Sequence, residues 1–267
     1  MKGCVLLFFL LIQLEIVKAQ SDPDYTIELS NPGEKSSLYL KSYNASEVML
    51  TGYDGRNIQV TFGSPGQGKF SKEDFLFDMY EGNNKVSIIK RSSANDQQLI
   101  ISLKIPFDCE VIVDSYFAKK INLSYIQSNV KISSQTADIL VANIRGNIEA
   151  KTFNGKLNIE KLDGAAILNN TEGDILVKFS SLSASDPSAI TNIHGNIEIH
   201  LPESEKATLE LNSLKGKITT DLKLTMANRA AGDSNAKKYS VLRQLNGGGV
   251  WFSIENLHGN ISLLKTK

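Results

Sequence analysis

We predict an all-β chain whose main part is a single-chain parallel β-solenoid, or β-helix, with about 18–22 residues in each two-strand rung. Glycine recurs at intervals of nine residues, at Gly146, Gly155, Gly164 and Gly173. Two positions after each glycine comes an apolar residue, and another follows two positions later. Nine residues accommodate a short strand and a turn, but no helix. A strand with one apolar face and no hairpin partner buries that face by stacking on its own copies.

The first 19 residues have the pattern of a cleaved signal peptide. Lys2 precedes an apolar run from Val5 to Ile12, and Ala19 is a small residue at the predicted cleavage point. The run is shorter than the roughly 20 apolar residues of a membrane-spanning helix, and no later stretch is long enough either. We therefore expect an exported protein, periplasmic or on the cell surface, with no transmembrane segment after signal removal.

The composition of the remaining chain, 20–267, excludes some partners. The 29 basic and 29 acidic residues of the full sequence become 27 and 28 once the signal peptide is removed, which gives a net charge of −1. This balance argues against nucleic acid as a partner. Cys109 is then the sole cysteine, so no intramolecular disulfide can form. Its apolar neighbours, Val111 to Val113, favour a buried structural thiol.

Residues 20–94 are predicted to be an N-terminal β segment and cap. Short alternating stretches at 25–29, 37–41 and 57–61 are typical of strands. An aromatic cluster follows and contains Phe70, Phe75, Phe77 and Tyr80. Because the open end of a solenoid needs a cover, we expect this cluster to cap it, and a ligand surface is the alternative.

Residues 95–267 are predicted to form the solenoid repeat domain. The nine-residue apolar ladder extends backwards from the glycines through Ile139, Val130, Ile121 and Ile112, although Asp114 breaks the second apolar position. After Gly173 the same phrase returns at Gly195, Gly216 and Gly259, with steps of 22, 21 and 43 residues. We interpret these steps as near multiples of a two-strand rung that carry insertions.

The two-strand rung predicts one column of charges. Asp138, Lys156 and Asp174 would stack on one side, and opposite charges at such an exposed site contribute about 0–1 kcal/mol per pair. The alternative is a meander of antiparallel hairpins, because Asn154-Gly155 and Asp163-Gly164 also suit hairpin turns. If Asp138 lay far from Lys156, the 18-residue rung would be wrong.

Two insertions interrupt the late repeats, at 180–188 and 226–246. Loops added to a solenoid lie on its outside and often carry specific contacts. The second insertion supplies the candidate partner-binding residues, which are Arg229, Asp233, Lys237, Tyr239 and Arg243.

The sequence offers little catalytic chemistry. His194 and His258 each precede a repeat glycine, which favours surface turns, and the third histidine, His200, has no marked partner. We therefore predict no catalytic, cofactor-binding or metal-binding residues. Enzymatic β-solenoids that act on polysaccharides gather Asp, Lys and Arg on one face. The group that could do so here is Asp138, Arg145, Lys156 and Asp174, for which a structural role is favoured.

Several phrases resemble the bacterial putative-adhesin family, also called Toastrack, which is related to head-GIN-type domains. They are Leu103 to Pro106, the Gly-Asn-Ile and Gly-Asp-Ile turns at Gly146 and Gly173, Ile199 to Pro202, and Leu245 to Gly249 with Gly259 to Leu263. The resemblance covers roughly 95–267. It implies an extracytoplasmic β-helical domain without established catalytic residues, and it carries over no family site.

These observations predict an exported, non-catalytic binding or scaffold protein of the bacterial envelope. It would engage a protein or glycan of the envelope or surface through the solenoid faces and the 226–246 loop. The alternatives are a β-helix-type enzyme acting on polysaccharides and a purely structural or envelope-stress-associated domain.

Overall fold

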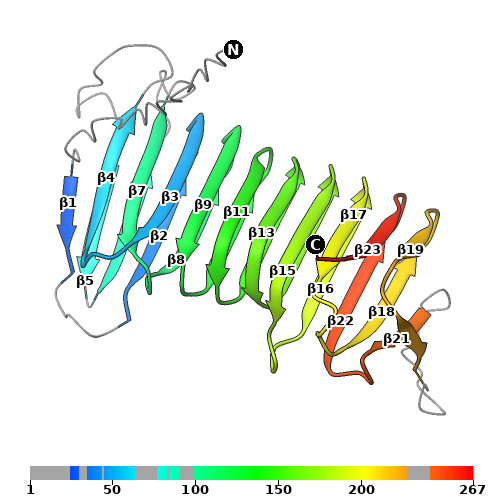
Figure 1. Cartoon of the computed structure of the whole chain (residues 1–267). Helices are drawn as coiled ribbons and strands as arrows, with labels where there is room; N and C mark the ends of the chain where they lie inside the picture. Colours follow the sequence, from blue (N-terminus) through cyan, green and yellow to red (C-terminus); the bar gives the residue numbers. More distant parts are fainter. Residues whose placement is uncertain are drawn as a thin grey trace, which may run out of the picture.

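The computed structural model describes residues 25–29, 35–43, 45–63, 77–82, 84–90, 99–227 and 241–266. All elements in these ranges are β-strands, and they form an 11-stranded sheet A and a 12-stranded sheet B (Figure 1). Within this part of the chain, no helix is long and apolar enough to cross a membrane. The predicted signal peptide, residues 1–19, lies outside the described residues.

The strands of each sheet lie in an order that differs from the order of the chain. Sheet A contains, in spatial order, β1 (Tyr25–Glu28), β4 (Asn57–Gly63), β7 (Ile100–Pro106), β3 (Glu47–Tyr53), β9 (Lys120–Ile126), β11 (Asp138–Arg145), β13 (Leu157–Gly164), β15 (Ile175–Leu182), β17 (Ile197–Leu201), β23 (Ile261–Lys265) and β19 (Ile218–Thr220). Sheet B contains β20 (Leu224–Met226), β21 (Val241–Leu245), β18 (Ala207–Ser213), β22 (Val250–Asn256), β16 (Ser188–His194), β14 (Ala166–Glu172), β12 (Ile148–Asn154), β10 (Val130–Ser134), β8 (Glu110–Ser115), β2 (Ser37–Ser42), β6 (Lys85–Lys90) and β5 (Phe77–Gly82).

The central rungs confirm the predicted parallel β-solenoid. Each rung takes one strand from each sheet, and β11, β13 and β15 pair in parallel, with Ile139 beside Leu157 and Leu157 beside Ile175. Hydrogen bonds between successive rungs join residues 18 apart, and the step rises to 22 after β15. Both values lie within the predicted range. The antiparallel meander is therefore wrong for these strands.

The apolar ladder forms the core between the two sheets. The inward residues of the central rungs are Ile121, Leu123, Ile139, Val141, Leu157 and Ile159 from sheet A, and Val130, Ile132, Ile148, Ala150, Ala166 and Leu168 from sheet B. Fully burying a Val, Leu or Ile side chain contributes roughly 1.5–3 kcal/mol. Stacking these residues along the axis thus stabilises one continuous core.

The structure corrects one position of the predicted ladder. Ile112 is not part of the core, because Val111 and Val113 of β8 point inward instead. Val111 pairs with Val130, so this rung step is 19 residues rather than 18. The extra residue moves Ile112 and Asp114 to the outer face, which explains why Asp114 appeared to break the apolar rule.

The turns that lead from sheet B to sheet A hold buried asparagines. Asn170, Asn192 and Asn256 are buried and lie in register in β14, β16 and β22. The Nδ2 atom of Asn192 donates to the carbonyl of Gly173, and that of Asn256 donates to the carbonyl of Gly195, both at 2.9 Å. These side chains satisfy turn carbonyls that would otherwise lack a partner.

The rungs at both ends are not in chain order. At the C-terminal end, the rung β22–β23 lies between β16–β17 and β18–β19. Gly259 therefore stacks on Gly195, and Gly216 stacks on Gly259. The interpretation of the 21- and 43-residue steps as near multiples of a two-strand rung with insertions is therefore wrong, because the 21-residue step spans two rungs and the 43-residue step leads back to the rung between them. At the other end, the rung β2–β3 likewise lies between β6–β7 and β8–β9.

In the described part of the chain, three of the four sheet edges are formed by strands that pair antiparallel with their neighbours. β4 pairs with β7 and β1 with β4, β5 pairs with β6, and β21 pairs with β18 and β20. The fourth edge is β19, which has three residues. Short edges and a reversed strand direction oppose further parallel stacking. Phe70, Phe75 and the side chains of Phe77 and Tyr80 lie outside the described part, so the aromatic cap stays a prediction.

Candidate functional site

The predicted column of Asp138, Lys156 and Asp174 exists, but its contacts differ from those expected. Oδ1 of Asp138 accepts a hydrogen bond from the backbone N–H of Lys156 at 2.9 Å. Oδ1 of Asp174 accepts one from the backbone N–H of Asn196 at 2.8 Å. The proximity of Asp138 and Lys156 confirms the 18-residue rung. The expected carboxylate–ammonium stack is wrong, because the carboxylates bond to main chain instead.

The structure does not bring the four residues considered for polysaccharide chemistry together. Asp138 begins β11 and Arg145 ends it. With about 3.3 Å per residue, the two side chains start roughly 23 Å apart. Across the part of the chain that the structure describes, no group of three or more His, Cys, Asp or Glu side chains could hold a metal ion.

The histidines lie on the surface. The rings of His194 and His258 stack with their centroids 4.5 Å apart, at neighbouring turns. Desolvation lowers the pKa of His258, and the positive charges of Lys215 and His194 lower it further. His200 Nε2 lies 2.6 Å from Oε1 of Glu198 on the same strand, β17.

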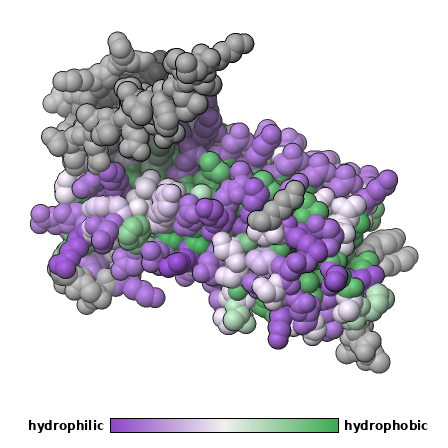
Figure 2. All heavy atoms as spheres, viewed as in Figure 1, coloured by the Kyte–Doolittle hydropathy of each residue, from purple (hydrophilic) through white to green (hydrophobic). Residues whose placement is uncertain are grey.

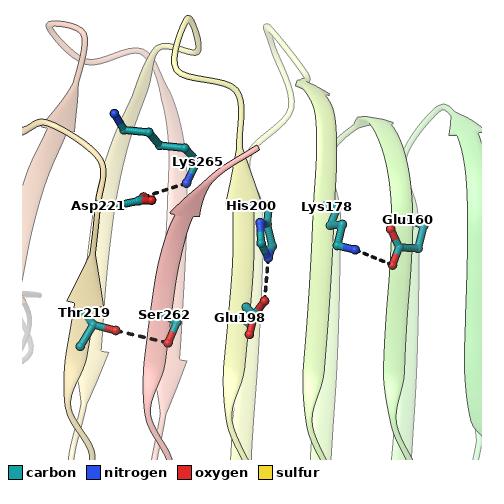
Figure 3. Close-up of polar contacts among 8 residues, drawn as sticks. All are labelled: Glu160, Lys178, Glu198, His200, Thr219, Asp221, Ser262 and Lys265. Carbon is teal, nitrogen blue, oxygen red and sulfur yellow. Dashed lines mark hydrogen bonds and ion pairs between the residues drawn. The ribbon is translucent and has the colours of Figure 1, made fainter. Parts of the chain in front are cut away.

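Several charged side chains on the outer face of sheet A form polar contacts with neighbouring groups (Figure 3). Lys178 Nζ lies 3.0 Å from Oε1 of Glu160 on the neighbouring strand. Asp221 accepts a hydrogen bond from the backbone N–H of Lys265 at 2.8 Å. On the face seen in Figure 2, hydrophilic and hydrophobic residues are interspersed over much of the surface. Exposed pairs of this kind contribute little to stability.

A different arrangement occurs where β9, β11 and β13 end. Tyr125, Asn143 and Lys161 have φ angles of 59°, 57° and 56°. They lie one per rung, each just before an inward residue. Such angles are unfavourable for Tyr and Lys and are better tolerated by Asn, and a β-bulge of this kind turns its side chain away from the regular alternation. We call the surface they border the bulge hollow.

The bulge hollow has a volume of about 410 Å³. Its lining includes Phe107, Tyr125, Asn143, Arg145, Lys161 and Asp163. Tyr125 is 55% exposed. Arg145 lies in register with Asp163 of the next strand, and Asp163 accepts a hydrogen bond from Ser181 Oγ. Among the described residues, neither Arg145 nor Lys161 forms an ion pair.

The repeated apolar spacing could have revealed the bulges from the sequence. The inward residues before the hollow are separated by two positions and then by three, as in Ile139, Val141 and Ile144. The same spacing occurs in the rungs before and after, and a regular strand would keep the spacing at two. Because we aligned the repeats on their glycines, we did not predict the extra residue in each rung, which is Tyr125, Asn143 or Lys161.

The 180–188 insertion folds back over the outside of sheet B. Oδ2 of Asp186 accepts hydrogen bonds from Asn147 Nδ2 at 3.1 Å and from Ser183 Oγ at 3.0 Å. These hydrogen bonds lower the pKa of Asp186. The loop borders a second hollow of about 380 Å³ that contains the exposed side chain of Ile167. It is therefore anchored two rungs away from its own strand.

The residues proposed for partner binding are only partly covered by the structure. Arg229, Asp233, Lys237 and Tyr239 lie outside the described residues, between β20 and β21. Arg243 lies in β21, partly buried, and its Nη1 atom donates to the carbonyl of Leu242 at 2.9 Å. Their role in binding stays a prediction.

Cys109 is the buried thiol that the sequence predicted. Its side chain is fully buried, and among the described residues it is a free cysteine. Burial raises the pKa of the Cys109 thiol to about 11. Because the thiolate is the nucleophilic form, burial and the raised pKa both disfavour reaction of this cysteine in the folded protein.

Comparison with known proteins places the chain as follows. The family model described as Toastrack DUF4097 matches residues 55–263. Among solved structures, a putative cell adhesion protein from Clostridium sporogenes is 10% identical, with 92% of this chain and 100% of that chain covered and a TM-score of 0.36. A putative adhesin from Bacteroides fragilis is 9% identical, with 91% and 95% covered and a TM-score of 0.36. No curated protein matches the sequence.

Proposed function

The chain belongs to the Toastrack DUF4097 family, and from that premise we propose that it is an exported, non-catalytic, adhesin-like binding or scaffold module of the cell envelope. It engages a protein or glycan through its outer faces and the 226–246 loop, in the periplasm or at the cell surface. The sequence pattern of residues 1–19 supports export.

The observation that carries this proposal is the contrast between two kinds of polar residue. The carboxylates of Asp138 and Asp174 bond to the main chain of the next rung. The cations of Arg145 and Lys161 border a hollow and have no ion pair among the described residues. Groups of the first kind hold the solenoid together, whereas groups of the second kind are available to a ligand. This supports binding rather than catalysis.

A capture experiment tests the proposal. The mature protein, immobilised through its C-terminus, is incubated with envelope extracts, and bound protein and glycan are identified by mass spectrometry. We expect saturable capture that weakens when residues 229–240 are replaced by a Gly-Ser linker. The control replaces the 183–187 loop, which is anchored to Asn147. If no saturable ligand is captured from any envelope fraction, the binding proposal fails and a purely structural role replaces it.

A separate assay addresses the enzyme alternative. The protein is incubated with a polysaccharide panel, and products are followed by chromatography. We expect no turnover. Turnover that disappears in Asp138→Asn or Asp174→Asn, with an unchanged melting temperature, would contradict a non-catalytic role.

A further inference from the structure

The bulges that border the hollow are confined to a few rungs. β13 pairs with β15 through a register shift, in which Glu160 lies beside Lys178 but Leu162 lies beside Phe179. β15 therefore packs Phe179 into the core two positions after Val177, and the additional residue, Ser180, follows Phe179 instead of preceding it. No residue of β15 has a positive φ angle, so the chain reaches the core at this point without the strained conformation of the three upstream residues. Each positive-φ residue costs of order 1–3 kcal/mol, and such strain concentrates at binding sites.

The bulges place aromatic surface at the hollow. Tyr125 is 55% exposed, although aromatic rings usually pack into the core when they can. Phe107 borders the same hollow, and a Cβ atom added to Gly52 would touch both its ring and the carbonyl of Tyr125. The absence of a side chain at position 52 therefore leaves room for the backbone of Tyr125 and the ring of Phe107 on this side of β3. Exposed aromatic faces of this kind stack on the C–H faces of sugar rings.

The polar groups beside the rings recognise carboxylates and hydroxyls. An unpaired guanidinium such as that of Arg145 binds a carboxylate with two parallel hydrogen bonds. Lys161 adds a second positive charge one rung away. The Asn143 amide and the Asp163 carboxylate supply a donor and acceptors for hydroxyl groups. Together these groups match an acidic sugar better than a neutral sugar or an apolar peptide.

The residues that border the hollow are spaced along the solenoid axis, which indicates how a ligand would be oriented. Tyr125, Asn143 and Lys161 come from successive rungs, which are about 4.8 Å apart. A pyranose unit in an extended chain has a similar length. We propose that the bulge hollow binds an anionic oligosaccharide containing uronic acids, which lies along the solenoid axis with about one sugar per rung. This inference rests on the proposed function and names the ligand class of one of its surfaces.

Isothermal titration calorimetry of the mature protein tests the site. The probes are a galacturonic acid hexamer, a neutral glucose hexamer, and an oligoglutamate of matched charge. We expect the galacturonate to bind, with an affinity that falls as salt rises. Tyr125→Asn removes the ring and introduces a residue that tolerates a positive φ angle, whereas Arg145→Gln removes the positive charge. Each variant should weaken binding about tenfold, or about 1.4 kcal/mol.

Matched controls lie at the opposite turn of the rungs. Phe153 is 59% exposed, and Lys156 is an exposed cation whose backbone N–H is retained in any variant. Phe153→Ala and Lys156→Gln should leave galacturonate affinity unchanged. Melting temperatures of all four variants show whether a loss of binding reflects unfolding.

Each other outcome overturns a defined part of the inference. Equal binding of the glucose hexamer refutes recognition of charge, and equal binding of oligoglutamate refutes a sugar ligand. No binding of any probe, or equal losses in the control variants, refutes the site itself. If no probe binds in calorimetry but envelope capture persists in the Tyr125→Asn, Arg145→Gln double variant, the proposed function stands and the proposed site alone is refuted.

Discussion

The stacked glycines make a prediction in which two physical effects can be separated. A Cβ atom at Gly155 would lie less than 3.0 Å from the carbonyl oxygen of Ala137 on the neighbouring rung, although the φ angle of Gly155 is outside the left-handed region. Gly247 is the converse, because its φ angle is +84° but a Cβ atom there would meet nothing within 4 Å. Gly195 combines both effects, with a φ angle of +119° and a clash with the Gly173 carbonyl.

The expected losses follow from these geometries. Gly247→Ala should cost about 1 kcal/mol, since a left-handed φ costs roughly 1–2 kcal/mol and the less flexible unfolded chain returns about 0.4–1 kcal/mol. Gly155→Ala should cost about 3 kcal/mol, at the upper end of overpacking penalties, because a backbone carbonyl must move. Gly195→Ala should cost about 4 kcal/mol or more, because both effects act there.

Urea unfolding of the three variants, followed by circular dichroism, measures these losses. If the unfolding free energy depends equally steeply on urea in all variants, the urea concentration at the transition midpoint should fall least for Gly247→Ala and most for Gly195→Ala. If Gly155→Ala lost no more stability than Gly247→Ala, the close approach of successive turns would not be what requires glycine. The nine-residue period would then need another physical explanation.

Three further predictions concern single side chains and the N-terminus. The lowered pKa of His258 makes the folded protein bind fewer protons than the unfolded chain, so its contribution to stability is complete above the ordinary pKa of 6.5 and falls as pH drops through 6.5 toward the folded pKa. His258→Asn should reduce this pH dependence of the urea midpoint between pH 5 and 8, and an unchanged pH dependence would contradict the prediction. Asn256→Leu should destabilise by roughly 1–3 kcal/mol because the buried Asn256 amide is the partner of the Gly195 carbonyl and the Gly259 N–H. Exposed Asn260→Ala should cost less in the same urea assay. Mass spectrometry of protein purified from an exporting host should give a chain that begins at Gln20, and an intact N-terminus would refute the cleavage site.

The candidate site was only partly within reach of sequence reasoning. The apolar period predicted which residues of the central rungs face the core, and the spacing of Asp138 and Lys156 predicted their proximity. It did not predict that the Asp138 carboxylate bonds to a backbone N–H, because residue spacing does not specify side-chain geometry. The 2-then-3 spacing that produces the bulges was present at Ile139, Val141 and Ile144, but its result, a hollow with unpaired cations, depends on three rungs lying side by side.

The sequence by itself determined the local unit of this protein. A strand of alternating apolar residues followed by a glycine turn encodes one face to bury and one way to turn, and both are properties of about nine neighbouring residues. The tertiary structure alone decided which rungs are neighbours. β22–β23 could stack on any rung with the same apolar pattern, and it lies between β16–β17 and β18–β19. That choice depends on long-range strand pairing, in which every backbone group of every rung must find a partner, and no local pattern encodes it.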